Sequence, residues 1–229
     1  MKDHEDTILA FIAGYVDTLG FVALFGLFTA HVTGNFILIG AEVAGVGQGV
    51  LLKLLAFPAF VLGVGSASVL AKLLERRGVA HPGQALHVWQ ALLLAAFVAA
   101  GWRAAPIDDA NAASVLIAGV LGATAMGVQN ARPKVLRSTG LPHTVMTGNV
   151  TQIVLDIVEL THRGAQEGQG PQVLARLRAT LIAMGSFALG AIGGAFAFVY
   201  ASFGGLLLPI ALLLLLGRSG RALAPSSGA

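Results

Sequence analysis

Six runs of mostly apolar residues constrain this chain more than any other feature of its sequence. They cover residues 8–28, 54–74, 86–101, 112–128, 181–201 and 206–217. A transmembrane helix needs about 20 predominantly apolar residues, and most of these runs come close to that length. The chain is also only 11% charged, against about 25% in a typical soluble domain. We therefore predict an all-α integral membrane protein.

An internal repeat is built around the triplet Thr-Gly-Asn, which occurs twice, each time before a short apolar segment. The matching blocks, in chain order, are 14–17 (GYVD) with 127–130 (GVQN), 33–35 with 147–149, Glu42 with Asp156, and 60–63 (FVLG) with 187–190 (FALG). Matching blocks in the same order indicate a duplication. We predict two membrane repeats, residues 1–107 and 108–229, that form one integrated domain.

Two apolar segments, Phe36–Val46 and Val150–Leu160, are too short to cross a bilayer. They measure about 16–22 Å as helices, against a hydrocarbon core of about 30 Å. If all eight segments crossed, only six of the 14 Lys and Arg residues would face the cytoplasm. If the short segments enter and leave on the same side, twelve face the cytoplasm and only Lys53 and Arg103 lie outside. The positive-inside rule favours the second arrangement.

The predicted fold is therefore six transmembrane helices plus two re-entrant half-helices, with both termini cytoplasmic. Three spans per repeat make the second repeat inverted relative to the first, as in many transporters. The chain begins MKDHEDTILAF, which has neither the basic region nor the cleavage site of a signal peptide. We expect the first apolar run to be retained as a spanning helix.

Several classes of chemistry are excluded by residues that the sequence lacks. Without cysteine there are no disulfides, iron–sulfur clusters or thiolate metal sites. No HExxH-like spacing indicates a metal, and no GxxxxGK[ST] motif indicates use of ATP. We expect no cofactor. The net charge of +3 is attributed to cytoplasmic loops, and no nucleic-acid partner is expected.

The two triplets form the predicted solute site. In an inverted pair, the N-termini of the half-helices approach each other near the midplane, where backbone N–H groups favour an anion or a hydrogen-bond acceptor. Thr and Asn are expected to cap these helices, and Gly to let the backbone approach a solute. The predicted binding residues are Thr33, Gly34, Asn35, Thr147, Gly148, Asn149, the neighbouring His31 and His143, and Gln129 and Asn130 in the fifth span. A purely structural capping role for each triplet is the alternative.

Three acidic residues are predicted to couple transport to protons or ions: Asp17, Glu42 and Asp156. Asp17 lies at the centre of the first run, where a carboxylate costs about 2.5–3.5 kcal/mol even on lenient scales. It either binds a proton or is a structural residue bonded to Thr18, a backbone amide or an arginine. Its counterpart, Asn130, cannot titrate, which favours one coupling site. Glu42 and Asp156 either flank the mouths of the pathway or are solvated.

The blocks GYVDTLGF, LFTAHVTGN, GVQNAR and TVMTGNVTQIVLD resemble the YoaK-like family of bacterial membrane proteins over essentially the whole chain. The resemblance implies a multi-pass protein of the bacterial inner membrane and, more loosely, transport of a small molecule. It assigns no role to individual residues.

The leading functional hypothesis is a small-solute permease in the lipid bilayer, a secondary transporter with proton coupling through Asp17. Its alternatives are a passive channel of the same architecture and a non-transporting structural or assembly protein. An intramembrane enzyme with Asp17 and either His31 or His143 as acid and base is disfavoured. The sequence has no nucleophile elbow, metal motif or paired aspartates, so we expect no enzymatic activity. A homodimer packed on the glycine-rich helices is compatible with such a thin bundle.

Overall fold

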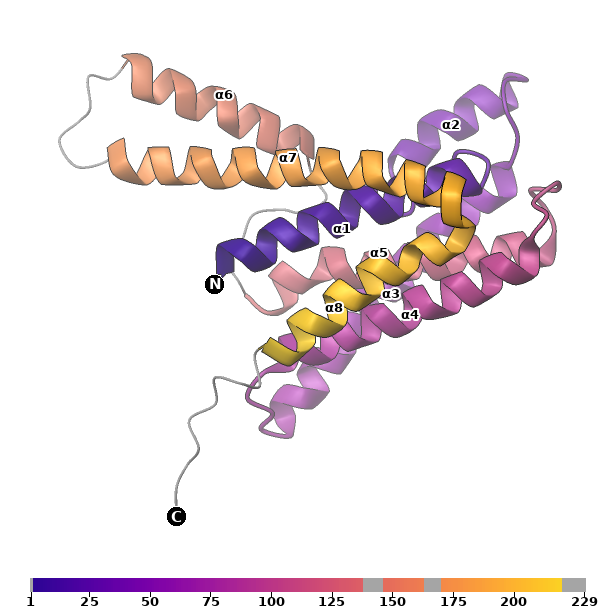
Figure 1. The fold of residues 1–229 in the computed structure, drawn as a ribbon, viewed down its shortest axis with the longest axis horizontal. Coiled ribbons are helices and arrows are strands. Elements are labelled where there is room, and N and C mark those ends of the chain that lie inside the picture. Colours follow the sequence, from indigo (N-terminus) through magenta and orange to yellow (C-terminus); the bar gives the residue numbers. More distant parts are fainter. Residues whose placement is uncertain (1, 138–145, 163–169, 220–229) are drawn as a thin grey trace.

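The computed structural model describes residues 2–137, 146–162 and 170–219, and within these ranges the chain forms helices and no strands. The predicted all-α class is confirmed. The elements are α1 (Lys2–Ala23), α2 (Gly34–Val43), α3 (Val50–Arg76), α4 (Pro82–Ala104), α5 (Ala113–Val135), α6 (Met146–His162), α7 (Gly170–Ala201), the 3₁₀ helix η1 (Ser202–Leu206) and α8 (Leu207–Ser219) (Figure 1).

Five helical stretches in the described part of the chain are long and apolar enough to cross a membrane. Four of them are α1, α3, α4 and α5, and the fifth runs through α7, η1 and α8. This last stretch has 49 residues and would measure about 74 Å if straight, far more than one crossing needs. The chain instead bends at η1, and α8 packs back against α4 (Figure 1). Because α8 has only 13 residues, a sixth full crossing stays a prediction.

The bend at η1 is held by contacts from α1 and α4. Phe203 is fully buried, close against the backbone of Gly101, and its ring lies 5.6 Å from that of Phe97. The hydroxyl of Tyr15 donates a hydrogen bond to the carbonyl of Gly205 at 2.9 Å. An aromatic anchor and a bonded carbonyl therefore fix the point at which the chain reverses.

The first helix is shorter than the apolar run that predicted it. The run extends to Phe28, but α1 ends at Ala23. Phe25 and Gly26 have positive φ angles of 50° and 76°, and the N–H of Gly26 bonds back to the carbonyl of Phe21. This left-handed turn is a common way to end a helix, and it overrides the apolar character of the residues beyond.

The two short helices differ in length and surroundings. Helix α2 has 10 residues, about 15 Å, and contacts only α3 among the other helices described. Helix α6 has 17 residues, about 25 Å, which is longer than predicted, and likewise contacts only α7. Figure 1 shows α6 and the first half of α7 projecting away from the other helices.

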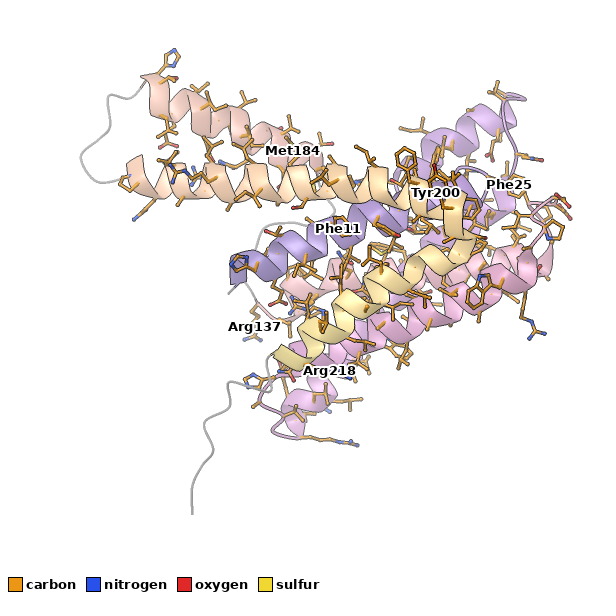
Figure 2. The ribbon with its side chains drawn as sticks, viewed as in Figure 1. Phe11, Phe25, Arg137, Met184, Tyr200 and Arg218 are labelled. Atoms are coloured by element: carbon orange, nitrogen blue, oxygen red, sulfur yellow. The ribbon has the colours of Figure 1, made fainter. Side chains whose placement is uncertain are left out.

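Charged residues separate between the two ends of the bundle. Helices α1, α4 and α7 run in one direction and α3, α5 and α8 in the other (Figure 1). One end therefore carries the C-termini of α3, α5 and α8, and Figure 2 shows Arg137 and Arg218 there. The opposite end, where Figure 2 shows Phe25 and Tyr200, carries Lys53 and Arg103. Which of these ends faces the cytoplasm stays a prediction.

The most extensive helix contacts join one predicted repeat to the other. These pairs are α1 with α7, α3 with α5, α4 with α5, and α4 with α8. In the first pair, Gly14 lies against the carbonyl of Phe187, and Gly190 lies against the carbonyl of Phe11. Neither position has room for a Cβ atom. Small residues allow such close approach where no hydrophobic effect drives helices together.

The pair α3–α5 repeats this contact at the aligned positions. Gly127, which aligns with Gly14, lies against the carbonyl of Phe60, and Gly63, which aligns with Gly190, lies against that of Thr124. The alignment of the two repeats thus corresponds to equivalent backbone contacts.

Adding one methyl group at these glycines should destabilise the protein. We expect Gly190→Ala or Gly63→Ala to lower the midpoint of thermal unfolding in detergent by about 5 °C, because overpacking costs about 1–3 kcal/mol. The matched controls are Gly185→Ala on α7 and Gly65→Ala on α3, where the new methyl meets open space. Equal midpoints for the two kinds of variant would contradict the close contacts.

Candidate functional site

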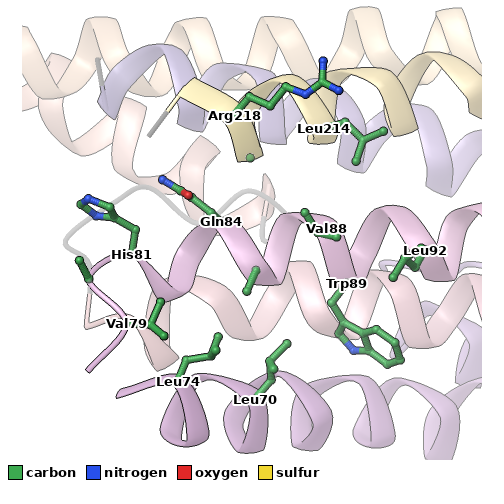
Figure 3. A pocket seen from close by; sticks show the side chains of 13 residues that line it. Leu70, Leu74, Val79, His81, Gln84, Val88, Trp89, Leu92, Leu214 and Arg218 are labelled. Atoms are coloured by element: carbon green, nitrogen blue, oxygen red, sulfur yellow. The ribbon is translucent and has the colours of Figure 1, made fainter. Parts of the chain in front are cut away.

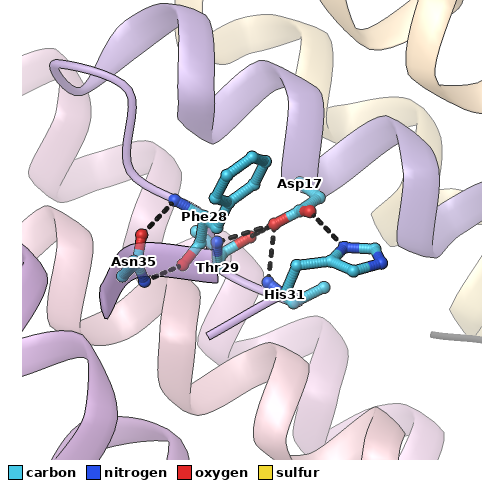
Figure 4. Close-up of polar contacts among 6 residues, drawn as sticks. Asp17, Phe28, Thr29, His31 and Asn35 are labelled. Atoms are coloured by element: carbon cyan, nitrogen blue, oxygen red, sulfur yellow. Dashed lines mark hydrogen bonds and ion pairs between the residues drawn. The ribbon is translucent and has the colours of Figure 1, made fainter. Parts of the chain in front are cut away.

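The loop after α1 folds back along its own helix and surrounds Asp17 (Figure 4). Asp17 Oδ1 accepts hydrogen bonds from the backbone N–H of Thr29 at 2.7 Å and of Ala30 at 2.6 Å. The hydroxyl of Thr29 donates to the same oxygen at 3.2 Å. Asp17 is 4% exposed and lies six residues before the end of α1, about 9 Å along the helix. Non-helical backbone therefore reaches well inside the bundle.

His31 forms a hydrogen bond with the second carboxylate oxygen of Asp17. Its Nδ1 lies 2.7 Å from Asp17 Oδ2, and its ring packs edge-on against Phe187 of α7, with centroids 5.6 Å apart. The side chain of His31 is 33% exposed, whereas that of Asp17 is 5% exposed. His31 is thus the more exposed member of the pair. Of the structural alternatives predicted for Asp17, the backbone amide is the one observed.

The first triplet holds the loop but does not cap α2 as predicted. Asn35 accepts from the N–H of Phe28 at 2.9 Å and donates to the carbonyl of Phe28 at 2.8 Å, and it is 1% exposed. Thr33 makes no side-chain capping hydrogen bond, so that prediction is wrong. The reason is local: the N–H groups of Gly34, Asn35 and Phe36 already bond to carbonyls three residues earlier.

The second triplet lies within the first turn of α6, which begins at Met146. Thr147 and Gly148 are exposed, whereas Asn149 is buried, with its amide nitrogen 3.6 Å from the sulfur of Met146. Helices α2 and α6 do not contact each other in the part of the chain that the structure describes. A shared site between the two triplets therefore stays a prediction. His143 lies outside the described residues.

Glu42 and Asp156 each form an ion pair with the long helix that follows. Glu42 on α2 pairs with Lys53 on α3, and both side chains are buried, at 6% and 1% exposure. Asp156 on α6 is fully buried and pairs with Arg176 on α7, which is 45% exposed. Sequence reasoning missed both partners. The cations near the start of each long helix, Lys53 on α3 and both Arg176 and Arg178 on α7, were a usable signal, since a charge at that depth needs a partner.

Of the predicted residues on α5, Gln129 belongs to a polar network that joins this helix to α1 and α4. It is buried, donates to the carbonyl of Leu9 at 2.7 Å and accepts from Gln90 at 2.7 Å. Asn130 is half-buried on the same helix. Nearer the helix ends, Glu5 bonds to His87 at 3.1 Å and pairs with Arg132. The sequence did not indicate this second cluster, which also joins α1, α4 and α5.

No group of three or more His, Cys, Asp or Glu side chains is placed to hold a metal ion within the described ranges. The chemistry that the site offers is hydrogen bonding and proton exchange. Its components are one buried carboxylate, two backbone amides, a hydroxyl and an imidazole that is partly accessible.

Removing the carboxylate should release the loop. The chain contains no cysteine, so Ala30→Cys introduces a unique and buried thiol as a label site. We expect Asp17→Ala to speed the reaction of this thiol with a polar maleimide at least about tenfold, because each hydrogen bond to a charged group contributes about 1.5–3 kcal/mol. Asn111→Cys, at an exposed position, serves as the control. Unchanged labelling of the Ala30→Cys thiol would show that Asp17 does not hold the loop.

Removing one charge of the buried ion pair Glu42–Lys53 should destabilise the protein more than removing both charges. We expect Glu42→Gln or Lys53→Met alone to lower the unfolding midpoint by about 10 °C, because either leaves an unpaired buried charge. The double variant should recover part of this loss, because it removes both charges but leaves the carbonyls of Phe25 and Gln48 without the ammonium of Lys53. Additive effects of the two changes in a thermal unfolding series would show that the two charges are not coupled.

The comparisons with known proteins support a transmembrane protein. The UPF0700 transmembrane protein YoaK of Bacillus subtilis (strain 168) is 30% identical over 152 residues, which are 66% of this chain and 65% of the relative. The match thus spans just under two thirds of the relative's length. No solved structure matches the chain. The family model described as "Protein of unknown function (DUF1275)" matches residues 7–218, and the chain belongs to this YoaK-like family of membrane proteins.

Proposed function

We propose that the chain is a permease of the bacterial inner membrane for a small polar or anionic solute. The observation that carries the proposal is the folded-back loop, whose amides meet a carboxylate inside the bundle. At membrane depth, irregular backbone is tolerated only where protein or a cavity surrounds it, and in transporters such backbone forms the binding site.

The proposed topology has six spans, two re-entrant half-helices and cytoplasmic termini. The opposite directions of α1 and α5, and of α3 and α7, support two inverted repeats (Figure 1). Gly14 makes the same kind of backbone contact in the pair α1–α7 as its aligned residue Gly127 makes in α3–α5. The same holds for Gly190 and its aligned residue Gly63, and both correspondences support this symmetry. The end that carries Arg132 and Arg218 is assigned to the cytoplasm by the positive-inside rule.

Asp17 supplies the proposed coupling. Its carboxylate accepts hydrogen bonds from the backbone N–H groups of Thr29 and Ala30. It thus takes the place that a free anion would have at these donors. A proton on Asp17 removes the charge that holds these donors, which then become available to an anion or a hydrogen-bond acceptor. His31, which reaches both Asp17 and the accessible surface, is the proposed route for the proton. Proton and solute would therefore bind together.

The two short helices are the proposed gates. Each contacts one long helix among those described, and each is fastened to it by an acidic residue, Glu42 on α2 and Asp156 on α6. Elements with few packing contacts are those that open most easily. In this proposal, Glu42 and Asp156 fix the hinges rather than bind the solute.

A structural or assembly role is the second candidate, because one observation favours it. Asp17, Asn35 and Gln129 all use their polar groups within the chain. Such residues can be explained by fold stability alone. A passive channel shares the permease architecture and differs only in lacking coupling.

Uptake into proteoliposomes tests the proposal. Small organic and inorganic anions and neutral polar solutes are screened with and without a pH gradient. We expect wild type to accumulate one class of solute, and Asp17→Asn to transport it without response to the gradient. The double variant Asn35→Ala/Asn149→Ala should lose at least about tenfold in rate, because losing Asn35 frees the loop and losing Asn149 removes the buried amide of the second triplet.

The matched control is Asn111→Ala, an exposed asparagine between α4 and α5. Uptake that only equilibrates, whatever the pH gradient, would indicate a channel. Absence of flux for every solute, with folded and correctly inserted protein, would overturn the permease and favour the structural role.

A further inference from the structure

A cavity of about 670 Å³ opens among the ends of three helices, away from the Asp17 cluster (Figure 3). It lies between the C-terminal part of α3, the N-terminal part of α4 and the end of α8. Its volume is in the range of small-molecule sites, about 300–1,000 Å³. Nothing in the proposed transport mechanism uses this cavity.

Most of the cavity wall is hydrocarbon. Leu70 and Leu74 come from α3, Val88 and Leu92 from α4, and Leu214 from α8. From the start of α4 at Pro82 to Leu92 the wall extends about 15 Å along the helix. This is the length of much of one acyl chain in one leaflet, whose hydrocarbon is about 15 Å deep.

The polar side chains of the wall have one chemical character. They are His81, Gln84 and Arg218, which can all donate hydrogen bonds, and no carboxylate of the described residues lines the cavity. The amide nitrogen of Gln84 is buried and has no hydrogen-bond partner among the described residues. Figure 3 shows His81 and Gln84 at the end of the cavity opposite Leu92. The cavity is therefore apolar at one end and suited to an anion at the other.

This polar end lies at the basic end of the bundle. Arg76 in the last turn of α3 and Arg218 in the last turn of α8 both lie there. Basic pockets between transmembrane helices on the cytoplasmic side bind anionic lipid headgroups. Among amphiphiles of similar length, the positive charge at this end thus favours those with an anionic headgroup.

We propose that the cavity is a binding site for an anionic phospholipid of the cytoplasmic leaflet. The acyl chain lies along Leu70, Leu92 and Leu214. The phosphate is bound by His81 and the amide of Gln84, and Arg218 on α8 adds positive charge to the cavity wall. The site is separate from the proposed solute site, so either can fail without the other.

Tryptophan fluorescence can test this directly, because Trp89 lines the cavity. The chain has two tryptophans, and Trp102→Phe leaves Trp89 as the single reporter. The full chain is placed in bilayers of phosphatidylcholine and phosphatidylglycerol, with one or the other brominated to quench fluorescence. We expect brominated phosphatidylglycerol to bind near Trp89 about fivefold more strongly than brominated phosphatidylcholine does. This is the factor expected for about 1 kcal/mol from one basic residue near an anionic surface.

In the Trp102→Phe background, Arg218→Gln and Gln84→Leu should each reduce this preference. The control Arg103→Gln, at the opposite end of α4, should leave it unchanged. An unchanged emission maximum of Trp89 shows that each variant is folded. Equal quenching by both lipids in the parent, or release of quenching by millimolar inorganic phosphate, would overturn the lipid site.

Discussion

The need to bond every backbone polar group inside a membrane is the constraint on which this structure depends. A backbone group left unsatisfied in hydrocarbon costs several kcal/mol. The loop after α1 brings non-helical backbone to the depth of Asp17, and side chains replace the missing helical bonds. Asp17 and Asn35 bond to the loop amides, Asn35 also bonds to a loop carbonyl, and Lys53 bonds to the carbonyl of Phe25.

The same solution recurs between helices. Gln129 donates to a carbonyl of α1, Tyr15 to a carbonyl of η1, and Thr124 to the carbonyl of Ala59 on α3. Several polar residues in this apolar chain thus join backbone to backbone. A polar residue within a membrane span is a functional candidate by default. Here the hydrogen-bond partners of each residue show which side chains support the fold and which are left as candidates for binding. Asp17 with His31 stands out because part of the pair is accessible.

Close packing through glycine joins the long helices of the bundle into pairs. Contacts at Gly14 and Gly63 bind α1 to α7 and α3 to α5, so neither repeat is complete alone. The short helices α2 and α6 lie outside these pairs. In the proposed permease, these two helices would be the elements that move against the fixed pairs during alternating access.

Sequence patterns determined the helical class, the membrane environment and the charge asymmetry, because hydropathy and the positive-inside rule act on local composition. Alignment within the chain paired Gly14 with Gly127 and Gly63 with Gly190, and the structure shows that helices meet at these glycines. The alignment could not find the end of α1 at Ala23, where a left-handed turn overrides an apolar run. Nor could it pair Glu42 with Lys53, or assign Asn35 to the backbone of Phe28. Those partners depend on how the chain folds back and how the helices cross. The spacing of residues along the sequence does not determine either.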